Sequence, residues 1–177
     1  MALSMPQGAF TLITARRIIN TEEDLMDTDK VISELRSLIQ LDIDAAHAYR
    51  QAIPEIESDE IQNQLGKFLD DHERHVVELG DALRGLGAEA PEYSRSFKGF
   101  LISGFTAIRA AMGIESALKA MRTNEKITNK MYSESAKMDF PPAIKELVLR
   151  NFEDEKRHLT YVEETLAAKA WKTAGVK

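Results

Sequence analysis

One pattern of chemically active residues occurs twice in this chain, and the two copies lie 83 positions apart. Residues 71–75 read Asp-His-Glu-Arg-His, and residues 154–158 read Asp-Glu-Lys-Arg-His. The same shift relates two further pairs, Asp42 with Glu125 and Tyr49 with Tyr132. A repeat of this kind predicts two similar helical hairpins that share one polar site.

The carboxylates and histidines of both copies lie on apolar faces of predicted helices. A helical period of about 3.6 residues places each of them among Leu, Ile, Val, Phe or Tyr side chains. Glu125 has the least apolar stripe, because Arg122 and Asn129 lie near it. A buried carboxylate without a partner costs several kcal/mol, so a metal cation is the simplest common partner. The candidate ligands are Asp42, His72, His75, Glu125, Glu155 and His158.

The spacing within each half predicts that these residues return to one level. Asp42 and His72 are 30 residues apart, as are Glu125 and Glu155, and the midpoints follow Pro54 or fall near 140–142. About 15 residues of helix, at 1.5 Å each, carry the chain roughly 22 Å to a turn and back. We therefore predict helices over 28–53, 58–86, 114–138 and 142–170, with caps at Thr28 and Ser58.

The composition fits a single all-α domain. The chain has 177 residues, 44% of them apolar, with only nine Gly and five Pro. We divide it into an N-terminal arm (1–27), a four-helix bundle (28–170) and a tail (171–177). A long connection between the second and third helices is predicted to carry an extra short helix over 96–112.

Charge, cysteine content and hydropathy limit the partners and the location that this chain can have. The net charge of −6 and the lack of a Lys/Arg stripe argue against nucleic acid. Without cysteine there are no disulfides or Cys-ligated metals, and a cytoplasmic location is expected. The most apolar run, 100–108, ends at Arg109 and is too short to span a membrane.

Two apolar segments outside the four predicted helices indicate self-association. We predict a homodimer that buries either Phe100, Leu101, Phe105 and Ile108 or the arm from Phe10 to Ile19.

The residues from about 30 to 170 resemble the ferritin-like superfamily, especially its rubrerythrin-like and bacterioferritin-like members. In that family two helices each give a carboxylate, commonly with a Tyr seven residues later, and two give Glu-x-x-His around a di-iron centre. The resemblance implies an antiparallel bundle with Asp42, Glu125, Glu155 and His158 as ligands. It also makes Tyr49 and Tyr132 candidates for residues that surround and orient the ligands. The first half is also similar to small uncharacterised four-helix families related to ferritins.

The first half departs from the family pattern at two positions, because Asp42 replaces the usual Glu and His72 replaces a bridging Glu. Three carboxylates leave about one positive charge uncompensated on two divalent ions, so the chain could bind one ion or two. Glu73 is a weaker candidate for a fourth carboxylate, since it points about 100° from His72. The imidazole and carboxylate set suits iron or manganese, and zinc would also accept it.

Two functions of different classes follow from these residues. The first is an iron- or manganese-dependent oxidase, peroxidase or detoxifying protein that acts on dioxygen or peroxide. The second is a non-catalytic structural or interaction module in which the histidines are core residues paired with carboxylates. We interpret His47 and Asp44 as a solvated pair outside either site.

Overall fold

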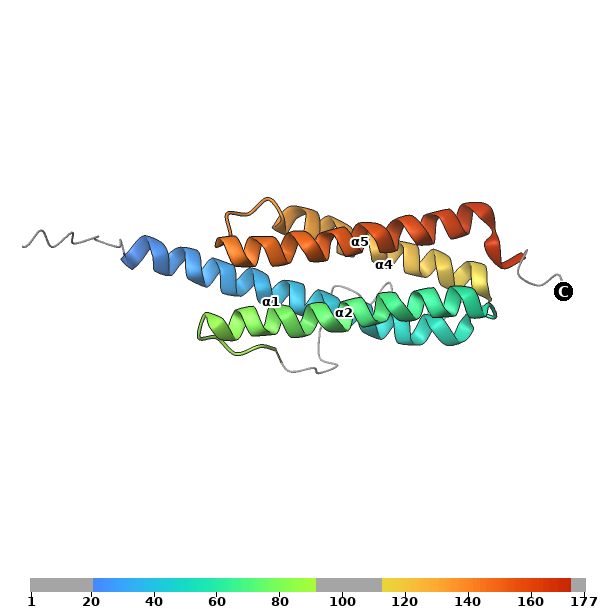
Figure 1. The fold of residues 1–177 in the computed structure, drawn as a ribbon, viewed down its shortest axis with the longest axis horizontal. Helices are drawn as coiled ribbons and strands as arrows, with labels where there is room; N and C mark the ends of the chain where they lie inside the picture. Colours follow the sequence, from blue (N-terminus) through green and yellow to red (C-terminus); the bar gives the residue numbers. More distant parts are fainter. Residues whose placement is uncertain (1–20, 92–112, 173–177) are drawn as a thin grey trace, which may run out of the picture.

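The computed structural model describes residues 21–91 and 113–172, and these residues contain helices but no β-strand (Figure 1). Four of the helices are long: α1 (Thr21–Ala52), α2 (Asp59–Gly85), α4 (Ile114–Ser135) and α5 (Pro142–Ala168). Two 3-10 turns complete the described part, η1 (Ile53–Glu55) and η2 (Ala170–Lys172). The predicted all-α four-helix bundle is confirmed.

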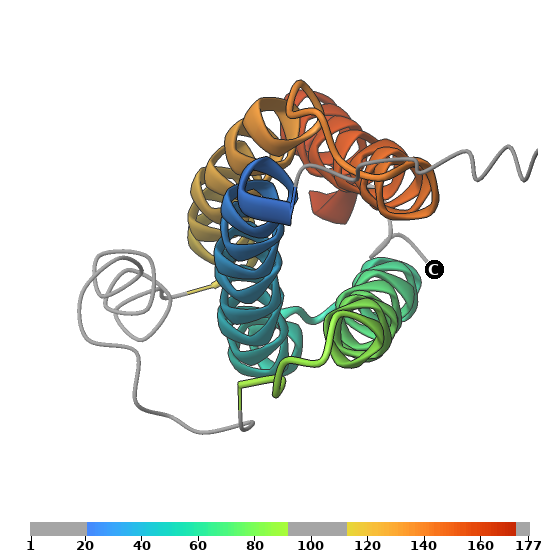
Figure 2. The ribbon, with the colours of Figure 1, turned by 90° about the vertical axis from the view of Figure 1, so that its left-hand side faces the viewer.

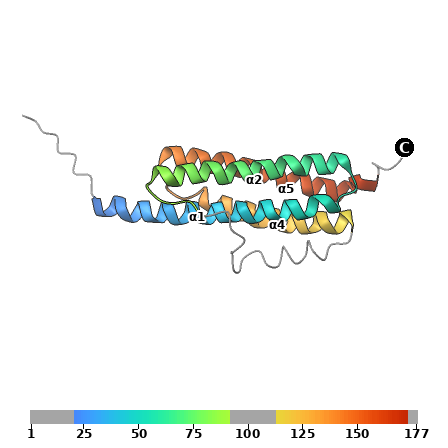
Figure 3. The same cartoon turned by 90° about the horizontal axis from the view of Figure 1, so that it is seen from below.

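The four long helices form two hairpins that turn at opposite ends of the bundle (Figures 1 and 3). α1 and α2 are joined at one end, and α4 and α5 at the other, so α2 ends far from the start of α4. Viewed along the bundle, the helices surround a common centre, with α1 next to both α2 and α4 (Figure 2). This arrangement brings residues from the middle of every helix to one place.

Backbone chemistry explains where most of the helices end. Pro54 lies in η1, and Pro142 occupies the first turn of α5, where a missing N–H costs least. Gly87 follows α2 with a φ of 77°, a left-handed conformation that glycine adopts without strain. Ser58 takes the N-cap position of α2 as predicted, although its side chain makes no capping hydrogen bond.

The start of α1 differs from the prediction. The helix begins at Thr21 rather than Thr28, because the segment between them contains no Pro or Gly and consists largely of good helix formers. The extra helix predicted over 96–112 and the arm from Phe10 to Ile19 lie outside the described residues. None of the described helices is long and apolar enough to cross a membrane.

Two apolar clusters divide the bundle along its length. The first contains Leu35, Leu38, Leu83 and Val148 among others, and the second contains Leu65, Phe68, Leu118 and Val162 among others. On every helix the candidate ligands lie between a residue of one cluster and a residue of the other. The structure therefore encloses one polar layer between two apolar ones.

The apolar cluster around Leu118 should carry much of the stability of the bundle. Leu118 is fully buried, whereas Leu149 on α5 is 42% exposed. We expect Leu118→Ala to lower the free energy of unfolding by about 2–5 kcal/mol, because it leaves a cavity, and Leu149→Ala by less than about 1 kcal/mol. Urea unfolding of both variants measures this, and equal losses would contradict the assigned core.

Candidate metal centre

All six candidate ligands come together in the polar layer. α1 supplies Asp42, α2 supplies His72 and His75, α4 supplies Glu125, and α5 supplies Glu155 and His158; each is 0% exposed. Among the described residues they form two overlapping groups whose ligand atoms lie within 4.8 Å of one another. The first group is Asp42, His72, His75 and Glu155, and the second is His72, Glu125, Glu155 and His158.

The first group already has the spacing of a metal coordination shell. Asp42 Oδ1 lies 2.9 Å from His72 Nδ1 and 3.3 Å from His75 Nδ1. Glu155 Oε1 lies 3.4 and 3.5 Å from the same two nitrogens. Atoms that share a metal at about 2.1 Å are roughly 3.0–3.4 Å apart in octahedral or tetrahedral geometry. These four separations are compatible with one cation bound by all four side chains.

The second group is slightly wider. Glu125 Oε1 lies 3.9 Å from His72 Nε2, and Glu125 Oε2 lies 3.9 Å from His158 Nδ1. These separations exceed hydrogen-bond length, so the polar atoms face one another without bonding directly. The two groups share His72 and Glu155, which lie in the centre of the layer.

Each of the two tyrosines bonds a carboxylate of the other hairpin. Tyr49 on α1 donates to Glu125 Oε1 at 2.7 Å, and Tyr132 on α4 donates to Asp42 Oδ2 at 2.6 Å. Burial, followed by the nearby Glu125 and Asp42 carboxylates, raises the pKa of both phenols well above the usual value. Both tyrosines therefore stay protonated and act as fixed donors that orient the two carboxylates.

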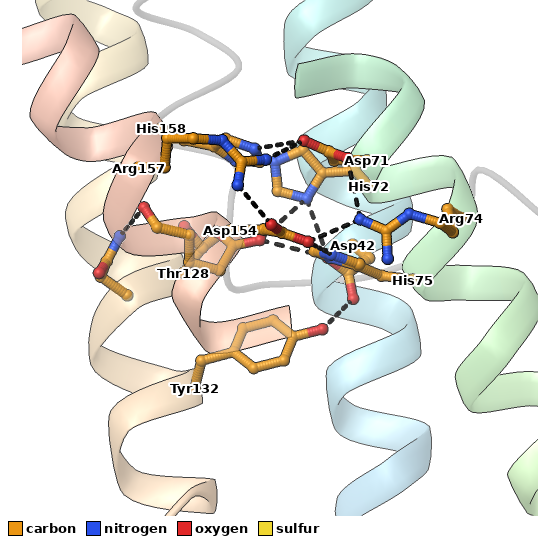
Figure 4. A network of polar contacts seen from close by, with 12 residues as sticks. Asp42, Asp71, His72, Arg74, His75, Thr128, Tyr132, Asp154, Arg157 and His158 are labelled. Atoms are coloured by element: carbon orange, nitrogen blue, oxygen red, sulfur yellow. Dashed lines mark hydrogen bonds and ion pairs between the residues drawn. The ribbon is translucent and has the colours of Figure 1, made fainter. Parts of the chain in front are cut away.

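His75 and His158 are also held from the opposite hairpin (Figure 4). His75 Nε2 donates to Asp154 Oδ2 at 3.2 Å, and His158 Nε2 donates to Asp71 Oδ2 at 3.1 Å. Ionised carboxylates accept hydrogen bonds but do not donate them, so each Nε2 carries the hydrogen. The Nδ1 atoms face the cluster: His158 Nδ1 has no hydrogen-bond partner among the described residues, whereas His75 Nδ1 can bind a metal once it loses the hydrogen that it donates to Asp42 Oδ1.

Two arginines complete this outer arrangement. Arg74 bonds Asp71 at 2.9 Å and Asp154 at 2.6 Å, while Arg157 bonds Asp154 at 2.6 Å and Asp71 at 2.7 Å. Burial opposes the charged aspartates, but the histidine and arginine partners outweigh it and hold the pKa of both carboxyls well below the usual range. The four residues form an ionic bridge between α2 and α5.

Within the cluster, burial and the neighbouring carboxylates shift the pKa of the histidines in opposite directions. Burial lowers the pKa of His75, but Asp42, Asp154 and Glu155 raise it to about 10. Burial also opposes protonation of His72, yet Glu155 and Asp42 raise its pKa well above the usual value. Without a metal, protons on these imidazoles supply the positive charge that the carboxylates require, and a bound metal must replace them.

Protons alone leave several buried polar atoms unsatisfied. Five inward atoms have no hydrogen-bond partner among the described residues: His72 Nε2, His158 Nδ1, Glu125 Oε2, and both carboxylate oxygens of Glu155. Buried polar atoms are nearly always hydrogen-bonded, and each exception costs about 1–3 kcal/mol. All five atoms belong to residues of the two ligand groups, and imidazole nitrogens together with carboxylate oxygens are atoms that a metal ion can bind.

Of two neighbouring residues, Asp44 differs from its sequence-based interpretation, whereas Glu73 agrees with its low ranking as a ligand. Asp44 is buried, with 8% exposure, and accepts a hydrogen bond from Gln40 at 3.1 Å, so its interpretation as a solvated residue is wrong. In α1, residues 41–49 are buried or half-buried on all sides of the helix. A prediction that buries only one apolar stripe therefore misplaces Asp44. Glu73, the weaker candidate for a fourth carboxylate, is paired with Arg50, and its side chain is 43% exposed.

The ionic bridge was missed as a functional element, although the sequence contains its signal. Asp71, Arg74, Asp154 and Arg157 belong to the repeated five-residue motif and obey the same 83-residue shift. Charged residues beside a predicted apolar stripe are usually solvated, and their pairing across the two hairpins becomes visible only in the fold.

Comparison with known proteins identifies the family. A family described as "Domain of unknown function (DUF2383)" matches residues 30–138, more than half of the chain. The chain belongs to this family. The match covers α2, α4 and all but the first nine residues of α1, and it ends before α5, so Glu155 and His158 lie outside it. A search of curated proteins finds no match.

The hydrogen bond from His75 to Asp154 provides a test of the outer arrangement. Asp154→Asn keeps the side-chain size but removes the negative charge that fixes the imidazole. We expect its affinity for Mn²⁺ to fall about 10–100-fold, as is usual when a partner of a metal-bound histidine is lost. Glu153→Gln is the matched control, because Glu153 is exposed and pairs with Lys156. Equal Mn²⁺ affinities in the two variants would contradict the orienting role.

Proposed function

We propose that this protein is a ferritin-like metalloprotein that binds iron or manganese in the middle of its bundle and uses it to reduce dioxygen or peroxide. The proposed ligands are Asp42, His72, His75, Glu125, Glu155 and His158. The observation that carries the proposal is the set of unsatisfied, fully buried atoms that converge between four helices.

The donor set favours iron or manganese over the alternatives. Three carboxylates with three imidazoles are intermediate ligands, softer than the all-oxygen shells of Mg²⁺ and Ca²⁺ and harder than thiolate sites. Zinc accepts the same atoms, but it has no redox chemistry. The resemblance to ferritin-like di-iron proteins, together with the four-helix fold, supports iron as the first candidate.

The chain's own residues define which reactants the centre can accept. All six side chains are 0% exposed, so a large substrate is excluded, and even a molecule as small as dioxygen or peroxide needs neighbouring side chains to move before it reaches them. Ferrous iron held by these residues would supply one electron per ion, so two ions with two protons would reduce peroxide to two molecules of water or dioxygen to peroxide. Tyr49 and Tyr132 keep Glu125 and Asp42 in place, and the bridge between α2 and α5 orients His75 and His158.

A non-catalytic structural module is the second candidate, and one observation favours it. His72 and His75 hold protons strongly in the metal-free cluster and compensate part of the carboxylate charge. A module of this kind would keep its polar layer without a metal and would show no affinity for one.

Metal content separates the two candidates. We expect freshly purified protein to contain iron or manganese, and Glu155→Ala to lower the affinity for the metal at least tenfold, because both ligand groups lose an atom. Glu153→Ala is the control, since it changes an exposed neighbour on the same helix. Elemental analysis and competition with a chelator measure both. Unchanged affinity in Glu155→Ala would refute the proposed ligand set.

The reaction is tested on protein loaded with ferrous iron in the absence of oxygen. Addition of peroxide or dioxygen should oxidise the bound iron faster than free iron under the same conditions, and His158→Ala should slow this step. A stopped-flow absorbance measurement follows the ferric product. Oxidation at the rate of free iron would leave metal binding intact but remove the proposed activity.

Two further expectations stay predictions. The homodimer rests on apolar segments outside the described residues, and sedimentation at tens of micromolar would test it. The cytoplasmic location rests on composition alone.

A further inference from the structure

His72 has a position that differs from those of the other two histidines in the centre. His75 and His158 each point one nitrogen into the cluster and the other outward to an aspartate. The ring of His72 lies between them, with centroids 5.8 Å from His75 and 5.1 Å from His158. Both of its nitrogens are enclosed by candidate ligands.

The two nitrogens of His72 face different groups. Nδ1 lies 2.9 Å from Asp42 Oδ1 and 3.4 Å from Glu155 Oε1, within the first group. Nε2 faces Glu125 Oε1 at 3.9 Å and has no hydrogen-bond partner among the described residues. An imidazole's nitrogens point about 140° apart, so one ring cannot direct both of them at a single ion. It can direct one at each of two ions.

The charges of the layer agree with this reading. Asp42, Glu125 and Glu155 supply three negative charges. Two divalent cations carry four positive charges, so one positive charge remains uncompensated. An imidazole that binds a metal through each nitrogen has lost both N–H hydrogens and carries one negative charge. The released protons pass to solvent, and the layer then has four negative charges against four positive ones.

We propose that His72 bridges two metal ions, with Nδ1 bound to the ion held by Asp42 and His75 and Nε2 bound to the ion held by Glu125 and His158. Glu155 belongs to both ligand groups and is the second bridge. The repeat relates His72 to Glu155, so the two bridging positions are equivalent in the two halves of the chain. This inference rests on the proposed metal-binding function and specifies the number of ions and their connection.

Titration with Co²⁺ tests the number of ions. The full-length protein should bind two equivalents, and His75→Ala and His158→Ala should bind one each, because each variant loses a ligand of one ion only. His47→Ala is the matched control, since His47 belongs to neither ligand group, and it should still bind two. His72→Ala should weaken both ions about tenfold or more. Thermal melts identify any variant that fails to fold.

Proton NMR of the Co²⁺-loaded protein tests the bridge itself. Co²⁺ strongly shifts the N–H signals of bound imidazoles, and these signals disappear in D₂O. The protein with two Co²⁺ ions should show two such signals, from the Nε2–H groups of His75 and His158, and none from His72. His75→Ala with one Co²⁺ should also show two, because the freed Nδ1 of His72 regains its hydrogen.

The outcomes distinguish this inference from the function on which it rests. Folded protein that binds no Co²⁺ would overturn both the metal-binding function and the bridge. One equivalent in the unsubstituted protein would overturn the bridge and leave metal binding intact. Two equivalents with a third exchangeable N–H signal would also overturn the bridge, since His72 would then bind through one nitrogen. The NMR experiment on unsubstituted protein remains decisive if His72→Ala does not fold.

Discussion

Compensation of buried negative charge is the constraint on which the structure of this bundle depends. Asp42, Glu125 and Glu155 have no contact with solvent, so water cannot stabilise their charges. The positive charge has to come from protons on neighbouring imidazoles or from metal ions in the same place. Apolar clusters on both sides of the layer confine these charged groups to the middle of the helices. All four helices are therefore aligned so that their polar residues meet in one layer.

The duplicated pattern makes the two hairpins depend on each other. Because the hairpins turn at opposite ends, the two copies of the pattern come from opposite hairpins and meet in one layer, where both ligand groups contain residues of both hairpins. Tyr49 orients a carboxylate of the second hairpin, and Tyr132 orients one of the first. In the same way, Asp71 of the first hairpin bonds His158 of the second, and Asp154 of the second hairpin bonds His75 of the first. Neither half can form its ligand geometry alone, which couples assembly of the bundle to assembly of the site.

The sequence alone predicts the helices and the cluster well, and it fails where several helices act together. Periodicity placed the six candidate ligands on buried helix faces, and the structure brings them together, while their role as ligands stays a prediction. The breaks at Pro54 and Pro142 located the hairpin turns. The start of α1 was placed too late because a cap candidate such as Thr28 does not stop a helix when the residues before it contain no Pro or Gly. Asp44 was misread because a helix with two neighbours buries more than one stripe. The ionic bridge between α2 and α5 was missed because its pairing requires the angle between two hairpins, which local pattern does not specify.

A histidine at the centre of the layer changes how the site can respond to a reactant. A carboxylate has two equivalent oxygens and can rotate to change how many it offers to a metal, whereas an imidazole offers one atom in each of two fixed directions. His72 is additionally confined between the rings of His75 and His158. If the proposed metal ions bind here, an open coordination position for a reactant would have to come from the carboxylates. Tyr49 holds Glu125 through Oε1, whereas neither oxygen of Glu155 accepts a hydrogen bond from the described residues, so Glu155 is the less constrained of these two carboxylates.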